Sequence, residues 1–201
     1  MKAVRTVVSA MWLAAMAMAT SIYDFTLKTA NGEDYPLSNY DHTPVILVVN
    51  VASECGFTDI NYRALQKYYD EYHQFGFEIV AVPSNQFGAQ EPGTYDDIVQ
   101  FAKTNYNVGF RIFDKVDVNG PNAHPLYTWL KANVPDDDGR DVAWNFEKFL
   151  VVDGKPWNRV AHNVNLDKVE DKILYALAHE ADYHHLDDHH VDDDDDSHDE
   201  L

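Results

Sequence analysis

Two apolar stretches separated by a helical stretch constrain the fold of this chain more than any other feature. Residues 45–51 form a nearly continuous β-branched run, which is typical of a strand buried on both faces. Residues 58–75 repeat leucine and tyrosine at helical spacing, and Gly76 can end that helix. A second buried strand is expected over residues 77–82, before Pro83. This order predicts a right-handed crossover between two parallel strands.

The rest of the chain continues the alternation of strands and helices. Asn31-Gly32 favours a tight turn, so a β-hairpin is expected between residues 22 and 37. Thr58 and Thr94 are the predicted N-caps of two helices. The further predicted elements are helices over residues 94–104, 125–131 and 166–181 and strands over residues 144–152 and 157–160. With no internal repeat, this pattern predicts one α/β domain over residues 20–181.

The two ends of the chain predict a protein of the secretory pathway. Lys2 and Arg5 precede a mostly apolar run, so residues 1–19 are predicted to be a removable signal peptide. The run is shorter than the roughly 20 apolar residues that a membrane-spanning helix needs. Residues 198–201 read His-Asp-Glu-Leu, the HDEL retrieval signal. We therefore expect residence in the endoplasmic reticulum lumen and recognition by the HDEL retrieval receptor.

The charge of the chain is strongly acidic and partly concentrated at its C-terminal end. The formal net charge is −19, which would repel a phosphate backbone, so nucleic acid is excluded as a partner. Residues 182–201 contain ten Asp or Glu, five His and no Lys or Arg, and are predicted to be a disordered tail that presents HDEL. Weak metal binding by the histidines and aspartates of this tail is the alternative.

The chain has a single cysteine, Cys55, so no intramolecular disulfide can form. Cys55 lies between a predicted buried strand and the start of a predicted helix, where backbone N–H groups and the helix dipole favour the nucleophilic thiolate. Gly56 beside it would allow a substrate to approach closely. The alternative is a small buried hydrophobic residue without chemistry, which is the commoner role of a free cysteine.

Three segments of the sequence resemble the signatures of one enzyme family. Residues 50–58 resemble the segment around the reactive sulfur or selenium of glutathione peroxidases, and residues 83–93 and 144–150 resemble the second and third signatures of that family. The resemblance extends over residues 23–181. It implies a thioredoxin-like fold with a central mixed sheet flanked by helices and an N-terminal β-hairpin.

The resemblance also implies a catalytic tetrad made of Cys55, Gln90, Trp144 and Asn145. Cys55 would attack the peroxide, while the amide and indole N–H groups of the other three would hold the thiolate and orient the substrate. None of these three donors titrates near neutral pH. Each also has a structural alternative: a core aromatic for Trp144, a turn residue for Asn145 and a solvent-facing residue for Gln90.

The implied activity is the reduction of hydrogen peroxide and of organic or lipid hydroperoxides through a Cys55 sulfenic acid. No cofactor and no metal are expected, but an external thiol is required. Relatives carry a resolving cysteine at the position of Ser84 or within the region of residues 101–113, and neither place holds a cysteine here. The thiol is expected to be glutathione or a protein disulfide isomerase-type protein. Ile60 stands where some glutathione users have a basic residue, which favours the isomerase-type protein.

The short segment of residues 132–143 resembles the monomeric members of the family, with an open site that admits bulky lipid hydroperoxides. The competing hypothesis is a non-catalytic interaction protein or redox sensor of the endoplasmic reticulum lumen on the same fold. A dithiol reductase is excluded, because the sequence contains no Cys-x-x-Cys motif.

Overall fold

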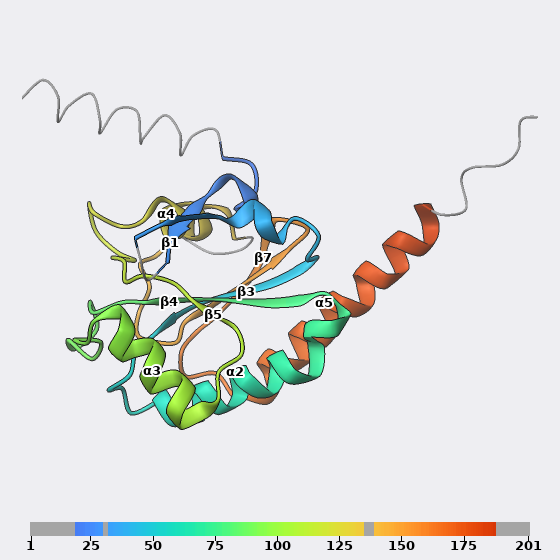
Figure 1. Cartoon of the computed structure of the whole chain (residues 1–201). Coiled ribbons are helices and arrows are strands. Elements are labelled where there is room, and N and C mark those ends of the chain that lie inside the picture. Colours follow the sequence, from blue (N-terminus) through green and yellow to red (C-terminus); the bar gives the residue numbers. More distant parts are fainter. Residues whose placement is uncertain (1–18, 30–31, 135–138, 188–201) are drawn as a thin grey trace, which may run out of the picture.

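The computed structural model describes residues 19–29, 32–134 and 139–187 of the chain (Figure 1). The strands are β1 (Thr26–Lys28), β2 (Asp34–Pro36), β3 (Val45–Val51), β4 (Phe77–Pro83), β5 (Arg111–Ile112), β6 (Lys148–Val152) and β7 (Lys155–Val160). The α-helices are α2 (Thr58–Tyr72), α3 (Tyr95–Tyr106), α4 (Pro125–Asn133) and α5 (Leu166–Asp187). Short 3-10 turns lie at η1 (Ile22–Asp24), η2 (Leu37–Tyr40) and η3 (His73–Phe75).

A mixed five-stranded sheet forms the centre of the described residues, in the order β5-β4-β3-β6-β7. β3, β4 and β5 run parallel, whereas β6 is antiparallel to both β3 and β7. Every residue of β3 and β4 is buried, as the two apolar runs predict. β1 and β2 form the expected antiparallel hairpin at the N-terminal side. The predicted α/β class, the mixed sheet and the hairpin are confirmed.

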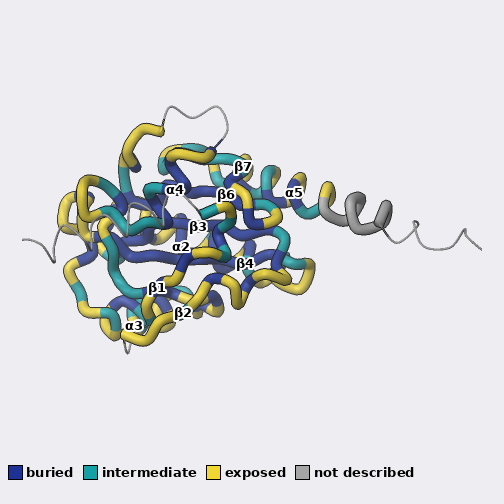
Figure 2. The backbone as a smooth tube through the Cα atoms, turned by 90° about the horizontal axis from the view of Figure 1, so that it is seen from above, coloured by how far each residue is buried: buried dark blue, intermediate teal, exposed yellow. Residues whose placement is uncertain are grey.

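Helices cover both faces of the sheet, so β3 and β4 have no face exposed to solvent (Figure 1). α2, α3 and α5 lie on one face, and α4 lies with the hairpin on the other. Alternate side chains of a strand point to opposite faces, and Leu47 accordingly packs with Tyr62 and Ile173 on one side, while Val48 packs with Leu126 on the other. Figure 2 shows the strands as the buried interior beneath exposed loops and helix faces.

The predicted crossover helix is present but ends earlier than expected. α2 stops at Tyr72, and the 3-10 turn η3 leads into Gly76, which adopts the left-handed conformation with φ of 90°. Glycine adopts this conformation without the clash that a Cβ atom causes. Thr94 caps α3 through a reciprocal capping box with Asp97, as predicted.

Two further predicted boundaries were wrong, and one strand was not predicted. The strand expected over residues 144–152 begins only at Lys148, because residues 144–147 turn beside the end of β3. β5 is two residues long and was not predicted, since so short a strand has no readable period. α5 continues past Ala181 to Asp187, six residues into the predicted tail, and no glycine or proline interrupts it.

Several predictions fall outside the described residues. These are the signal peptide except for Ala19, the tail beyond Asp187 with its histidines and aspartates, and the HDEL sequence. No helix in the described part combines the length and the apolar character that crossing a membrane requires.

Candidate active site

Cys55 lies in the loop between β3 and α2, and this loop is closed by its neighbour Thr58. The Cys55 backbone N–H donates to the Thr58 hydroxyl at 3.0 Å, and that hydroxyl donates to the Ala52 carbonyl at 2.8 Å. Thr58 therefore organises the nucleophile loop instead of capping α2, whose N-cap residue is Phe57 and makes no side-chain cap bond. The prediction that Thr58 caps the helix was wrong because its hydroxyl is used within the loop.

Cys55 is a member of the hydrophobic core and lies at its edge. The residue is 8% exposed and its thiol is free. The Phe57 backbone N–H donates to Sγ at 3.4 Å, a contact that a thiolate accepts more strongly than a thiol does. Gly56 is exposed, and a Cβ atom built on it meets no heavy atom within 4 Å. The space beside Gly56 is therefore open, and approach of a substrate to the sulfur along this side stays a prediction.

Gln90 lies on the loop that follows β4, directly beside the nucleophile loop. Its carbonyl accepts the backbone N–H of Glu54, the residue before Cys55, at 3.0 Å. Its own N–H donates to the Phe87 carbonyl at 3.3 Å, which closes a turn in the loop. Because β3 and β4 are parallel neighbours, the loops after their carboxyl ends meet at one edge of the sheet.

Trp144 and Asn145 lie on a turn just before β6 and reach the same edge. The Asn50 side chain, on β3, donates to the Trp144 carbonyl at 2.9 Å, and the Phe146 N–H donates to the Asn50 carbonyl at 2.6 Å. The half-buried Trp144 ring packs against Phe87, with ring centroids 5.9 Å apart. These contacts attach the turn to the end of β3, where Cys55 follows.

The structure joins two of the predicted tetrad residues directly. The Asn145 side-chain amide donates to the Gln90 side-chain oxygen at 2.9 Å. This bond engages the oxygen of Gln90 and leaves its amide N–H groups without a partner among the described residues. Cys55 follows Glu54, which is bonded to the Gln90 backbone. Direct donation to sulfur by Gln90, Trp144 or Asn145 stays a prediction.

Residues that the sequence reasoning missed hold these loops in place. Glu147 is fully buried and accepts Arg159 Nε at 2.6 Å, Arg140 Nη1 at 3.0 Å and the Ala143 N–H at 2.7 Å. It thereby fixes the segment that leads into Trp144. Asn50 is the polar residue of an otherwise apolar strand, Glu147 directly precedes β6, and Lys148 is the charged first residue of β6. A charged or polar residue within an apolar run is the signal that could have identified them.

Glu91 is a fully buried carboxyl beside the nucleophile loop. Neither of its oxygens, nor the Ser53 hydroxyl, has a hydrogen-bond partner of ordinary geometry in the described part of the chain. Burial raises the pKa of Glu91 to about 7, although the nearby Ser53 hydroxyl and N–H and the Lys115 ammonium limit the rise. Glu91 therefore changes charge near neutral pH, within a loop that adjoins the active site.

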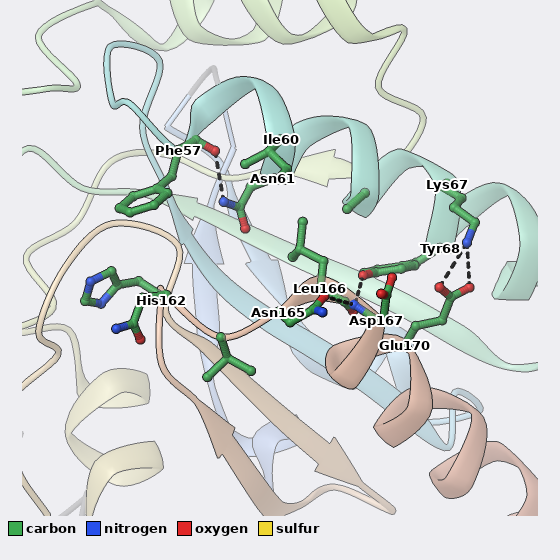
Figure 3. A pocket seen from close by; sticks show the side chains of 13 residues that line it. Phe57, Ile60, Asn61, Lys67, Tyr68, His162, Asn165, Leu166, Asp167 and Glu170 are labelled. Carbon is green, nitrogen blue, oxygen red and sulfur yellow. Dashed lines mark hydrogen bonds and ion pairs between the residues drawn. The ribbon is translucent and has the colours of Figure 1, made fainter.

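A pocket of about 520 Å³ opens beside the nucleophile loop (Figure 3). Phe57 and Ile60 form one wall and are 38% and 56% exposed. His162 faces Phe57 from the segment after β7, with ring centroids 5.7 Å apart. At the far end Lys67 forms an ion pair with Glu170 at 2.8 Å. The pocket thus offers apolar and aromatic surface within two residues of Cys55.

Comparisons with known proteins agree with this geometry. A family model described as glutathione peroxidase matches residues 22–131. The chain is 48% identical over 162 residues to the Arabidopsis thaliana protein named "Probable phospholipid hydroperoxide glutathione peroxidase 6, mitochondrial". That match covers 80% of this chain and 69% of the relative.

Solved structures give the same result for the fold. The structure named "Crystal structure of Trgpx in apo form" is similar with a TM-score of 0.64 and 38% identity, covering 80% of this chain and 97% of that one. A thiol:disulfide interchange protein of the thioredoxin family from Chlorobium tepidum is similar with a TM-score of 0.55 and 13% identity, over 76% of this chain and 92% of that one. The second match concerns the fold alone. The predicted thioredoxin-like fold is confirmed.

Glu91→Gln should change how stability depends on pH. Because the pKa of Glu91 is raised from 4.5 to about 7, the neutral carboxyl stabilises the fold below pH 4.5. That contribution is lost as pH rises through 7. Glutamine has the shape of the neutral carboxyl and does not titrate. The free energy of unfolding of the variant relative to wild type, measured with urea, should therefore be about 2 kcal/mol higher at pH 8 than at pH 5. Comparing the two pH values cancels any pH-independent effect of the amide, and an equal difference at both would contradict the raised pKa.

Proposed function

Because the chain belongs to the glutathione peroxidase family, we propose that it reduces hydrogen peroxide and organic or lipid hydroperoxides through Cys55. The chain is a glutathione peroxidase-like peroxidase, an oxidoreductase that acts on peroxide. The observation that carries the proposal is the meeting of three loops at the carboxyl end of β3, with Asn145 bonded to Gln90 and a backbone N–H bonded to the sulfur. The name of the Arabidopsis relative supports a phospholipid hydroperoxide as one substrate.

The first step oxidises Cys55. The thiolate attacks one peroxide oxygen, an S–O bond forms, and the O–O bond breaks with both electrons going to the departing oxygen. That oxygen takes one proton and leaves as water or an alcohol, so thiol and hydroperoxide become sulfenic acid and alcohol. The Gln90, Trp144 and Asn145 N–H groups are the donors that would orient the peroxide and stabilise the departing oxygen.

The second step needs a thiol from another molecule. Cys55 is the single cysteine of the chain, and Ser84, at the position where some relatives carry a resolving cysteine, is fully buried. An external thiol would attack the sulfenic sulfur, releasing water and leaving a mixed disulfide. A second thiol would then release Cys55 and form the disulfide product.

We favour a protein disulfide isomerase-type protein as that thiol. Glutathione carries a net negative charge, and this chain has a net charge of −19. Ile60 is exposed in the pocket beside Cys55, and Lys67 in the same pocket is paired with Glu170. Phe57 and Ile60 instead offer apolar surface to the residues that flank a protein thiol.

We also propose that the protein works as a monomer in the endoplasmic reticulum lumen, where the HDEL receptor retrieves it. The monomer rests on the short segment of residues 132–143, and the location rests on the signal-peptide pattern and the HDEL sequence. The name of the Arabidopsis relative assigns that protein to mitochondria. Deleting residues 198–201 should cause secretion from cells, and retention of the shortened chain would overturn the assignment.

The purified protein should form a sulfenic acid with one equivalent of hydrogen peroxide. A dimedone-type trap should label the wild type and leave Cys55→Ser unlabelled, as read by mass spectrometry of the intact chain. The free energy of unfolding of the Ser variant should stay within about 1 kcal/mol of wild type, since the change removes little buried volume. An unlabelled, folded wild type would favour the non-catalytic interaction protein.

Turnover should depend on the kind of thiol. With peroxide in excess, a reduced isomerase-type dithiol protein should be oxidised much faster than glutathione at equal thiol concentration. Ile60→Lys should raise the glutathione rate about fivefold, which corresponds to about 1 kcal/mol of charge attraction. Leu174→Lys, exposed on α5 outside the pocket, is the matched control. If the isomerase were oxidised no faster with the enzyme than without it, the proposed reductant would be wrong.

A further inference from the structure

Lys148 is a fully buried lysine on a strand of the central sheet. It lies on β6 opposite Val49 of β3, among apolar strand residues. Burying an ammonium group is costly unless hydrogen bonds or opposite charge compensate for the lost water. The nearest carboxylate, Glu147, is already engaged by Arg140 and Arg159. The energetic cost of placing Lys148 here calls for a role that an apolar residue could not fill.

The ammonium group of Lys148 bonds to two different parts of the active site. Nζ donates to the Asn61 side-chain oxygen at 2.8 Å and to the Phe146 carbonyl at 2.7 Å. Asn61 belongs to the first turn of α2, and Phe146 follows Asn145 in the turn before β6. One buried charge therefore links the segment after the nucleophile with the turn that carries Trp144 and Asn145.

A continuous set of hydrogen bonds leads from Lys148 to the sulfur. The Asn61 amide donates to the Phe57 carbonyl at 2.9 Å, as Figure 3 shows, and the Phe57 N–H donates to Cys55 Sγ at 3.4 Å. Asn61 is oriented by its bond to the ammonium, since only its oxygen can accept from Lys148 and only its nitrogen can donate to Phe57. Lys148 thus acts through the Asn61 side chain on Phe57, whose N–H contacts the sulfur and whose carbonyl also accepts the Asn61 backbone N–H at 3.1 Å.

The second contact of Lys148 holds a strained backbone conformation. Phe146 has φ of 66°, which is unusual for a bulky residue and costs of order 1–3 kcal/mol. The Lys148 bond to its carbonyl and the 2.6 Å bond from its N–H to the Asn50 carbonyl keep it there. This conformation sets the direction of the turn in which Asn145 reaches Gln90.

We propose that Lys148 is a positioning residue of the peroxidase reaction: its ammonium group aligns the Phe57 N–H with Cys55 and holds the Trp144–Asn145 turn against Gln90. The role rests on the proposed peroxidase function and deepens it. It makes the positions of two parts of the active site depend on one charged group that does not contact the substrate. Loss of that charge should misalign both donor groups together.

The charge state of Lys148 provides the test. Burial lowers the pKa of Lys148 to about 8, and the Glu147 carboxylate opposes that decrease. The groups that face it are Glu147 with its two arginines, Asn61 on α2, and the apolar Val49 on β3 and Val160 on β7. Because the folded pKa lies below the ordinary lysine pKa of 10.5, folding stability rises with pH between about 8 and 10.5. Positioning by the ammonium should decline over the same range, so the rate advantage that Lys148 gives to Cys55 should fall while stability rises.

The experiment compares wild type, Lys148→Met and the surface control Lys28→Met from pH 6 to pH 10. Two rates are measured at Cys55, oxidation by hydrogen peroxide and alkylation by iodoacetamide. Lys148→Met should lower both about tenfold or more at pH 7, whereas Lys28→Met should match wild type. The ratio of the wild-type rate to the Lys148→Met rate should decrease with a midpoint near pH 8, where wild type loses the charge. A ratio that stays constant with pH, or equals one throughout, would overturn the positioning role.

Lys148→Arg keeps the inference testable if Lys148→Met does not fold. The guanidinium group stays charged over the whole pH range and leaves Asn61 intact, so the effect of the charge on the alkylation rate should persist to higher pH than in wild type. An unchanged pH profile in this variant would contradict the proposal. Alkylation does not depend on peroxide chemistry, so a wild type that is alkylated as expected but never oxidised would refute the proposed function while leaving the positioning role supported.

Discussion

The hydrogen bond from the Asn145 amide to the Gln90 side-chain oxygen is the interaction on which the active site depends. It joins the loop after β4 to the turn before β6, and the Gln90 carbonyl in turn holds the backbone beside Cys55. Two side chains that are 55 residues apart in sequence are thereby fixed at one edge of the sheet. Since neither amide titrates near neutral pH, the geometry persists across the range in which a thiolate forms.

The fold explains why these loops meet. β3 and β4 are parallel neighbours, so their carboxyl ends lie side by side, and β6 starts its antiparallel course at the same edge of β3. Two buried carboxyl groups lie near that junction. Glu147 accepts the backbone N–H of Ala143, the residue before Trp144, and Glu91 lies next to Ser53 of the nucleophile loop. Their burial costs stability, which is acceptable where function requires a fixed geometry.

The sequence was sufficient for the buried strands and the crossover helix, because each has a local pattern, whereas Cys55 as the nucleophile stays a prediction that rests mainly on the family resemblance. It also supplied Gln90, Trp144 and Asn145, through resemblance to a family and not through periodicity. It did not reveal that residues 144–147 form a turn, since their alternation of apolar and polar residues suits a strand equally well. Nor did it reveal that the Thr58 hydroxyl bonds back to the nucleophile loop, since an N-cap bond is equally compatible with the local sequence. The burial of Lys148 was missed because its partner Asn61 is 87 residues away.

The most direct test of this account is a double-mutant cycle on the rate at which hydrogen peroxide oxidises Cys55, followed by stopped-flow tryptophan fluorescence. Gln90→Ala and Asn145→Ala should each slow the oxidation about tenfold or more. The double variant should be little slower than the worse single variant, because either change breaks the same bonded unit. Single variants that react as fast as wild type, or losses that multiply fully in the double variant, would contradict the claim that the two amides act together on the sulfur.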